Sequence, residues 1–144
     1  MAQDGKLRPI FRQNLPFIFW TSIETGMTMK GVPDSFAIKS SCAFWVEYKK
    51  TEANAVDLDP KQVAWHDRYL RCGGISFIAV RQQCSAGPRR PARDGLFLFR
   101  GADVKKLKAE GLRGAKPIGQ WDGGPAKWDW KRIEILLLAT KARK

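Results

Sequence analysis

The sequence predicts a single α/β domain, residues 1–144, in which a mixed sheet of four or five strands is flanked by helices. Two strand-like runs, Ser35–Ile38 and Ala43–Lys49, are separated by turn-compatible residues and predict a β-hairpin. Large apolar side chains occur on both faces of this hairpin, so we expect both faces of the sheet to be covered. A capped helix then leads into the apolar run Ile75–Val80, which predicts a strand parallel to Ala43–Lys49.

The segment before the hairpin contains two further elements. Leu7–Asn14 predicts a short helix, with Pro9 tolerated in its first turn. Phe17–Ile23 is aromatic and β-branched and predicts the first strand, which Glu24 ends. A glycine-containing loop, 26–31, then leads to the hairpin.

The hairpin register determines which polar side chains meet. With the turn centred between Ser40 and Ser41, Asp34 lies opposite Glu47, and directly opposed residues share a face of the sheet. Side chains alternate along a strand, so Lys49 joins Glu47 on that face. The sequence therefore predicts two carboxylates and an amine that converge.

Two carboxylates at this separation favour a bound cation. At roughly 5 Å and an effective dielectric near 20, two ionised carboxylates repel by about 3 kcal/mol, so the pair needs a shared proton or a metal ion. Oxygen ligands without cysteine or histidine suit Mg²⁺ or Mn²⁺ rather than zinc. Lys49 beside such an ion is free to meet an anionic substrate.

The helix that follows has a strong start signal. Thr51–Leu58 is polar and predicts an irregular connection, after which Asp59 is placed as the N-cap and Pro60 at the first helical position. Gln62, three residues after the cap, predicts a capping box, and Gly73 is expected to end the helix.

The same helix carries aromatic residues and the only histidine. Trp65 and Tyr69 fall on one helical stripe with Gln62, which predicts that both aromatic residues are core residues. His66 has no partner at metal-ligand spacing, so we expect it to be packed or exposed rather than a ligand or general base.

The C-terminal half predicts further elements. Gln82–Asp94 contains several arginines and predicts an extended basic loop that could follow phosphates, although charge runs are often only solvated. The remaining expectations are a strand at Leu96–Phe99, a short helix at Val104–Glu110 capped by Asp103, an irregular segment at Gly111–Ala126, and an apolar run at Ile133–Ala139 that is either strand or helix.

Composition favours an intracellular partner of high negative charge. The chain has 26 Lys and Arg against 14 Asp and Glu, a formal net charge of +12, which indicates a polyanion such as nucleic acid and, less strongly, a membrane surface. Three cysteines are too few and too widely spaced for a zinc knuckle, and their odd number argues against a secreted disulfide framework. No apolar run reaches the about 20 residues of a membrane span. We therefore expect a reduced, cytoplasmic protein.

The spacing of these residues resembles a known nuclease family. Pro33-Asp34, followed after a gap by Glu47-Tyr48-Lys49, resembles the signature of the PD-(D/E)XK nuclease superfamily. Gly31-Val32 before this motif, and Gln62 with Trp65 after it, resemble the VRR-NUC and phage or archaeal Holliday junction resolvase branch. The resemblance covers about residues 17–80 and implies a restriction-endonuclease-like fold.

The resemblance also implies roles for individual residues. Asp34, Glu47 and the Tyr48 carbonyl would hold Mg²⁺, with Mn²⁺ as a substitute, and Lys49 would orient the attacking water or offset developing charge. Gln62 would lie near the carboxylates. Glu24 is the candidate for a third acidic ligand, although relatives often place this glutamate on the first helix, which here offers only Arg8, Arg12 and Gln13.

The activity implied is Mg²⁺-dependent, structure-selective cleavage of DNA. The branch favours a Holliday junction resolvase of the phage type that acts as a homodimer on four-way junctions or other branched DNA. Two alternatives stay open: a restriction-type or nicking endonuclease on duplex DNA, and a non-catalytic basic nucleic-acid-binding protein in which Asp34 and Glu47 merely end strands.

Overall fold

The structure, a computed structural model, describes residues 4–24 and 31–139, and within them a six-stranded mixed sheet is packed between α-helices. The sheet therefore has more strands than the four or five predicted. The strands are β1 (Phe19–Ser22), β2 (Ser35–Lys39), β3 (Cys42–Thr51), β4 (Ser76–Cys84), β5 (Arg93–Arg100) and β6 (Gly119–Trp121), and the helices are α1 (Leu7–Asn14), α2 (Pro60–Arg71), α3 (Val104–Gly114) and α4 (Trp130–Ala139).

The strands lie in the sheet in the order in which they occur in the chain, β1 to β6. All neighbouring pairs are antiparallel except β3 and β4, which are parallel and are joined through α2. This confirms the predicted strand-helix-strand unit. Parallel strands need such a crossover, because a short turn can join only antiparallel neighbours.

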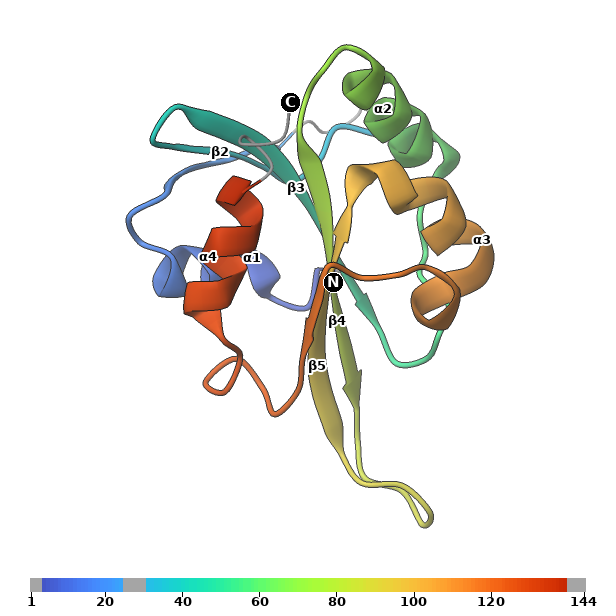
Figure 1. Ribbon diagram of the computed structural model, residues 1–144. Helices are drawn as coiled ribbons and strands as arrows, with labels where there is room; N and C mark the ends of the chain where they lie inside the picture. Colours follow the sequence, from blue (N-terminus) through green and yellow to red (C-terminus); the bar gives the residue numbers. More distant parts are fainter. Residues whose placement is uncertain (1–3, 25–30, 140–144) are drawn as a thin grey trace.

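Helices cover both faces of the sheet, as predicted. Figure 1 shows α1 and α4 on one side and α2 and α3 on the other. Alternation along β4 divides the core accordingly: Phe77 packs in the α1–α4 layer, and Ile78 packs in the α2–α3 layer. Because both faces are apolar, the strands read as continuous hydrophobic runs.

The β2–β3 hairpin has the predicted register, with Phe36 paired to Trp45 and Ile38 to Ala43. Ser40 and Ser41 form the turn with φ values of 52° and 65°, the left-handed pair that a two-residue hairpin turn requires. Two short polar residues can adopt this conformation at modest cost.

The predicted basic loop Gln82–Asp94 is wrong at both ends. β4 continues to Cys84 and β5 begins at Arg93, so the two strands pair along much of this segment and only residues 85–92 form the tip. This hairpin extends well beyond the helices (Figure 1). β4 and β5 stay paired beyond the part of the sheet that the helices cover, so polar residues such as Gln82 can belong to a strand there.

The C-terminal predictions also needed correction. α3 extends to Gly114, but its regular helix is broken at Gly111 (φ 76°, ψ −167°), directly after the predicted end at Glu110, and the Asp103 side chain makes no capping hydrogen bond. The segment expected to be irregular contains β6, which pairs with β5. The undecided apolar run belongs to helix α4, where Ile133 and Leu137, four residues apart, are buried on one face.

Two smaller expectations concern the membrane and the cysteines. Among the helices of residues 4–24 and 31–139, none combines the length and apolar character of a membrane span. Cys42, Cys72 and Cys84 are all free thiols.

Candidate active site

The hairpin brings the predicted carboxylates and lysine together. Glu47 pairs in the sheet with Ile78, whose side chain lies in the α2–α3 layer, so Glu47 and Lys49 lie on that face. Tyr48 lies on the opposite face, in the core with α1 and α4, as predicted. Extending the β2–β3 pairing one position beyond Ser35 and Val46 places Asp34 opposite Glu47.

Asp34 is held at the start of β2 by a backbone donor and a cation. Its Oδ2 accepts a hydrogen bond of 2.9 Å from the Tyr48 N–H, and its Oδ1 lies 3.6 Å from Nη2 of Arg8. Burial raises the pKa of Asp34, while the Tyr48 N–H and the Arg8 charge act to lower it. The carboxyl group is therefore oriented on one oxygen and accessible to a cation on the other.

Glu47 is the most deeply buried acid of the site, at 2% exposure. Oε2 accepts a hydrogen bond of 2.9 Å from Nε2 of Gln62, whereas Oε1 is buried and has no hydrogen-bond partner among the described residues. Burial, followed by the charge of Asp34, raises the pKa of Glu47 to about 9, and the charge of Lys49 opposes this shift. Without a cation, Glu47 is a neutral acid at about pH 7.

Gln62 serves the helix and the site at the same time. Its Oε1 accepts a 2.9 Å hydrogen bond from the Asp59 N–H, and Asp59 Oδ1 accepts one of 2.8 Å from the Lys61 N–H, which forms the predicted capping box. The other end of the same amide donates to Glu47. The capping role is confirmed, and the N-terminus of α2 thereby fixes the orientation of a site carboxyl group.

Arg8 of α1 is the residue that sequence reasoning missed. Its guanidinium lies between two acids, 3.6 Å from Asp34 and 4.0 Å from Glu24. The predicted first helix is confirmed. Where related nucleases often have a glutamate on this helix, the helix here supplies the cation of Arg8. The available signal was the spacing of Arg8 and Arg12, four residues apart on one face of an amphipathic helix.

Glu24 lies two residues beyond β1, which is shorter than predicted. Its side chain is 85% exposed, and the contact that it makes is with Arg8 rather than with the carboxyl pair. Its role as a third metal ligand stays a prediction. Most of the loop predicted to follow, residues 25–30, lies outside the described residues.

The donor set of Asp34 and Glu47 fits a magnesium ion. No group of three or more His, Cys, Asp or Glu side chains with metal-site geometry occurs in residues 4–24 and 31–139. Mg²⁺, however, commonly uses one or two carboxylates and keeps several waters. A divalent cation would replace the proton that Glu47 and Asp34 share and would lower the raised pKa values of both acids.

The prediction that Trp65 and Tyr69 are core residues is wrong, because both are half-buried and lie outside the two core clusters, whereas His66 is packed. The rings of Trp65 and Tyr69 are stacked at 4.7 Å, and Trp65 packs edge-on against Trp45 of β3 at 5.3 Å. His66 is fully buried, with Nδ1 2.8 Å from Oγ of Ser76. These residues fix α2 on the sheet and are not part of the carboxyl pair.

Comparison with known proteins adds no assignment. No protein-family profile matches the chain, and a search of curated proteins finds no significant match. The functional argument therefore depends on the geometry of the site and on the motif resemblance.

Proposed function

We propose that this protein is a divalent-metal-dependent DNA endonuclease of the PD-(D/E)XK type. The observation that carries the proposal is the pair of Asp34, whose side chain is 28% exposed, and the buried Glu47, with Lys49 on the same face of β3. A largely buried pair of acids with raised pKa values destabilises a metal-free fold, so a bound cation gives the arrangement a function.

Each residue then has a distinct task. Asp34 and Glu47 hold Mg²⁺ together with the Tyr48 carbonyl that the resemblance implies. When bound, the ion polarises the scissile phosphate and lowers the pKa of the attacking water. Lys49 positions that water or offsets the charge that develops on the phosphate. Gln62 keeps Glu47 in place, and Arg8 is within reach to exchange its contact with Asp34 for one with the phosphate.

DNA is the substrate that the charge favours. The net charge of +12 and the arginines of the β4–β5 hairpin supply contacts to phosphate without reading bases. We expect branched DNA, with four-way junctions first among the candidates, and a homodimer that cuts paired strands. A non-catalytic binding protein is the less favoured alternative, because buried carboxylates facing phosphate weaken binding.

The deciding experiment is a cleavage assay with matched variants. Labelled four-way junction, linear duplex and single strand are each incubated with and without Mg²⁺. Asp34→Asn and Glu47→Gln should abolish cleavage and leave DNA affinity unchanged or improved, because each removes a ligand and a negative charge. Asp57→Asn, at an exposed carboxylate of the α2 connection, is the control and should cleave normally.

Lys49→Ala separates metal binding from chemistry. It should lose most of the rate and retain Mg²⁺ affinity, since an ammonium group is not a ligand. Wild-type cleavage by Asp34→Asn and Glu47→Gln would refute the assignment. DNA binding without cleavage under every metal condition would favour the non-catalytic alternative.

A further inference from the structure

A second site-like feature lies beneath α3, away from the carboxyl pair. A groove of about 740 Å³ opens between the C-terminal end of α3, the connection after β3, and strands β4 to β6. We call it the α3 groove and define it by its cationic rim, Arg90, Arg93, Arg113 and Lys116, and by Phe97 on its floor. Its volume is in the range typical of ligand sites.

The rim charges are uncompensated. Four cations and one acid, Glu52, line the groove. No ion pair involving any of the four rim cations occurs in the part of the chain that the structure describes. All four are exposed, so the rim attracts anions from solvent.

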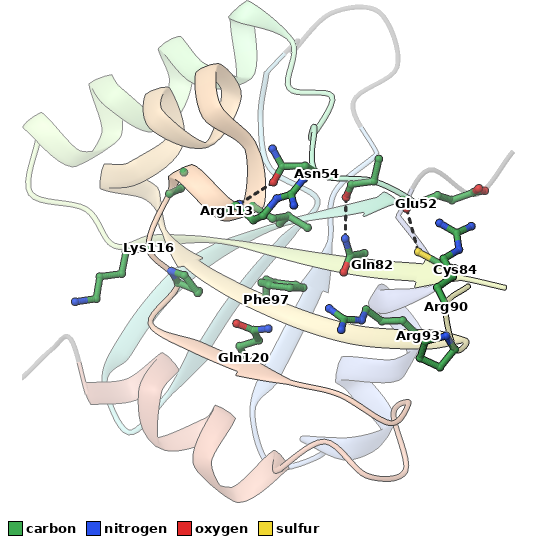
Figure 2. A pocket seen from close by; sticks show the side chains of 16 residues that line it. Glu52, Asn54, Gln82, Cys84, Arg90, Arg93, Phe97, Arg113, Lys116 and Gln120 are labelled. Atoms are coloured by element: carbon green, nitrogen blue, oxygen red, sulfur yellow. Dashed lines mark hydrogen bonds between the residues drawn. The ribbon is translucent and has the colours of Figure 1, made fainter. Parts of the chain in front are cut away.

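The cations are distributed along the groove rather than gathered at one point. Figure 2 shows Arg90 at one end, beside Cys84, and Lys116 at the opposite end, with Arg93 and Arg113 between them. A site for a single phosphate would have its cations gathered around one point. A row of separated charges instead matches an extended chain of phosphates.

The floor offers contacts of another kind. Phe97, Leu112 and Ala115 are buried apolar residues that line the groove. Beside them, Nε2 of Gln82 donates a 2.9 Å hydrogen bond to the Ala53 carbonyl, while Oε1 of Gln82 is buried with no partner among the described residues. The floor therefore presents apolar surface that suits a base, and the buried Gln82 Oε1 would become available to a donor group of a nucleotide once the side chain shifts.

From these features we infer that the α3 groove binds an unpaired strand of nucleic acid, with phosphates on the rim and bases toward the floor. A duplex is excluded from this mode because its bases face each other and cannot reach a floor between cationic walls. A strand can do so where its bases are unpaired, as in a flap, a gap or a branch point whose base pairs have opened. The inference rests on the proposed function for the identity of the polyanion as DNA.

The position of the groove relative to the carboxyl pair is consistent with one bound strand. Gln82 and Phe97 lie on the same face of the sheet as Glu47, since all three share that face with the α2–α3 core. Gln82 pairs with Thr51, four residues along β3 from Glu47, a span of roughly 13 Å. A strand held in the groove is thus a few nucleotides away from the candidate site.

The test measures binding without cleavage. Fluorescence anisotropy with an oligothymidine of about 12 residues, in EDTA, compares the wild type with the double variant Arg113→Ala/Lys116→Ala. Loss of two phosphate contacts should lower the slope of log K against log salt by about 1.4 and weaken binding roughly 25-fold at about 0.1 M salt. Both residues are exposed, and unchanged melting temperature checks the fold.

The control removes the same charge elsewhere. Lys106→Ala/Arg132→Ala deletes one lysine and one arginine that are exposed and outside the groove, and it should bind nearly as the wild type does. Equal losses in the two double variants would overturn the inference, because net charge alone would then explain binding. A loss confined to a duplex of the same length would also overturn it.

Thymidine monophosphate and inorganic phosphate serve as competitors that distinguish the sources of phosphate. If either competitor displaces the oligonucleotide only at millimolar concentration, the groove is a site for a strand. If thymidine monophosphate instead binds tightly, and Arg113→Ala/Lys116→Ala abolishes that binding, the groove is a site for a free nucleotide. Because the binding assay contains no metal, its result is independent of cleavage. A groove that does not bind a strand would not refute the proposed nuclease activity, and absence of cleavage would not invalidate the binding measurement.

Discussion

At the scale of single residues, the site is a pair of acids that does not stabilise the metal-free fold. Asp34 has a backbone donor and Arg8 as partners, whereas Glu47 has the Gln62 amide on Oε2 and, when protonated, a hydrogen bond to Asp34. If this proton is lost without a cation, two facing negative charges remain in a largely buried site. Glu47 is therefore where a cation would contribute most to stability.

Replacing Glu47 with glutamine should stabilise the metal-free protein above about pH 5. Between the unfolded pKa of 4.5 and the folded pKa of about 9, the folded state keeps a proton that the unfolded chain releases, so the wild type loses stability as pH rises. Glu47→Gln removes this slope.

Thermal melts in EDTA across this pH range provide the measurement, with the exposed Glu52→Gln as the control. Added Mg²⁺ should raise the melting temperature of the wild type and of Glu52→Gln, but not that of Glu47→Gln. Identical pH slopes in all three proteins would show that Glu47 titrates normally.

His66 should make the protein sensitive to acid in the opposite direction. Burial lowers the pKa of His66 to about 4, from 6.5, so the unfolded chain binds a proton that the folded protein does not. Its contribution to stability is present above pH 6.5 and is lost as pH falls toward 4, by roughly 3 kcal/mol at most. His66→Gln should flatten this acid limb in urea titrations, and an unchanged limb would contradict the assignment.

At the scale of elements, the N-terminus of α2 couples helix stability to the site through one amide. Gln62→Ala should lose the capping interaction, about 1 kcal/mol, and also reduce the single-turnover rate because Glu47 loses its donor. Asp59→Ala is the matched control, because it removes the cap without touching Glu47. It should lower the melting temperature similarly at a near-normal rate. Equal rates in the two variants would make Gln62 purely structural.

The hairpin and α2 could be predicted because local pattern and tertiary structure agree there. A short polar turn between two aromatic runs leaves one register that buries Phe44 and Val46, and this register brings Asp34 to Glu47. The Asp59 and Pro60 signals are likewise local.

Other features depend on contacts that the sequence does not display. A long side chain such as Arg8 can reach several acids, and only the packing of α1 selects Asp34 and Glu24. β6 is a three-residue strand that exists through pairing with β5. Ile133–Ala139 is apolar at nearly every position, so its period could not distinguish strand from helix.

At the scale of the whole molecule, the two helical layers have different roles. The α1–α4 layer carries much of the aromatic core, including Phe11 against Tyr48, while the α2–α3 layer borders both Glu47 and the α3 groove. The cationic β4–β5 hairpin extends past both layers (Figure 1). Phosphate contacts are thus available on the side of the sheet that also carries the candidate site.

This arrangement predicts selection of substrate by shape. Contacts to phosphate carry no base information, so discrimination must come from whether a DNA reaches the carboxyl pair and the α3 groove together. A linear duplex offers no strand free of its partner, whereas the base pairs at a branch point can be opened to release a few unpaired nucleotides. Four-way junctions should therefore be cut well ahead of linear duplexes of the same arm sequence, with binding that weakens steeply as salt rises.

Single-turnover cleavage of a four-way junction and of its four linear arms, at matched ionic strength, measures this preference. Light scattering on the junction complex tests the accompanying homodimer, in which two copies cut paired strands. Arg113→Ala/Lys116→Ala should reduce the preference for the junction, because it weakens the groove without altering Asp34 or Glu47. Equal rates on junction and linear arms, or one reproducible sequence-specific cut in linear DNA, would favour the restriction-type alternative. A monomer on the junction would separately exclude the paired cut.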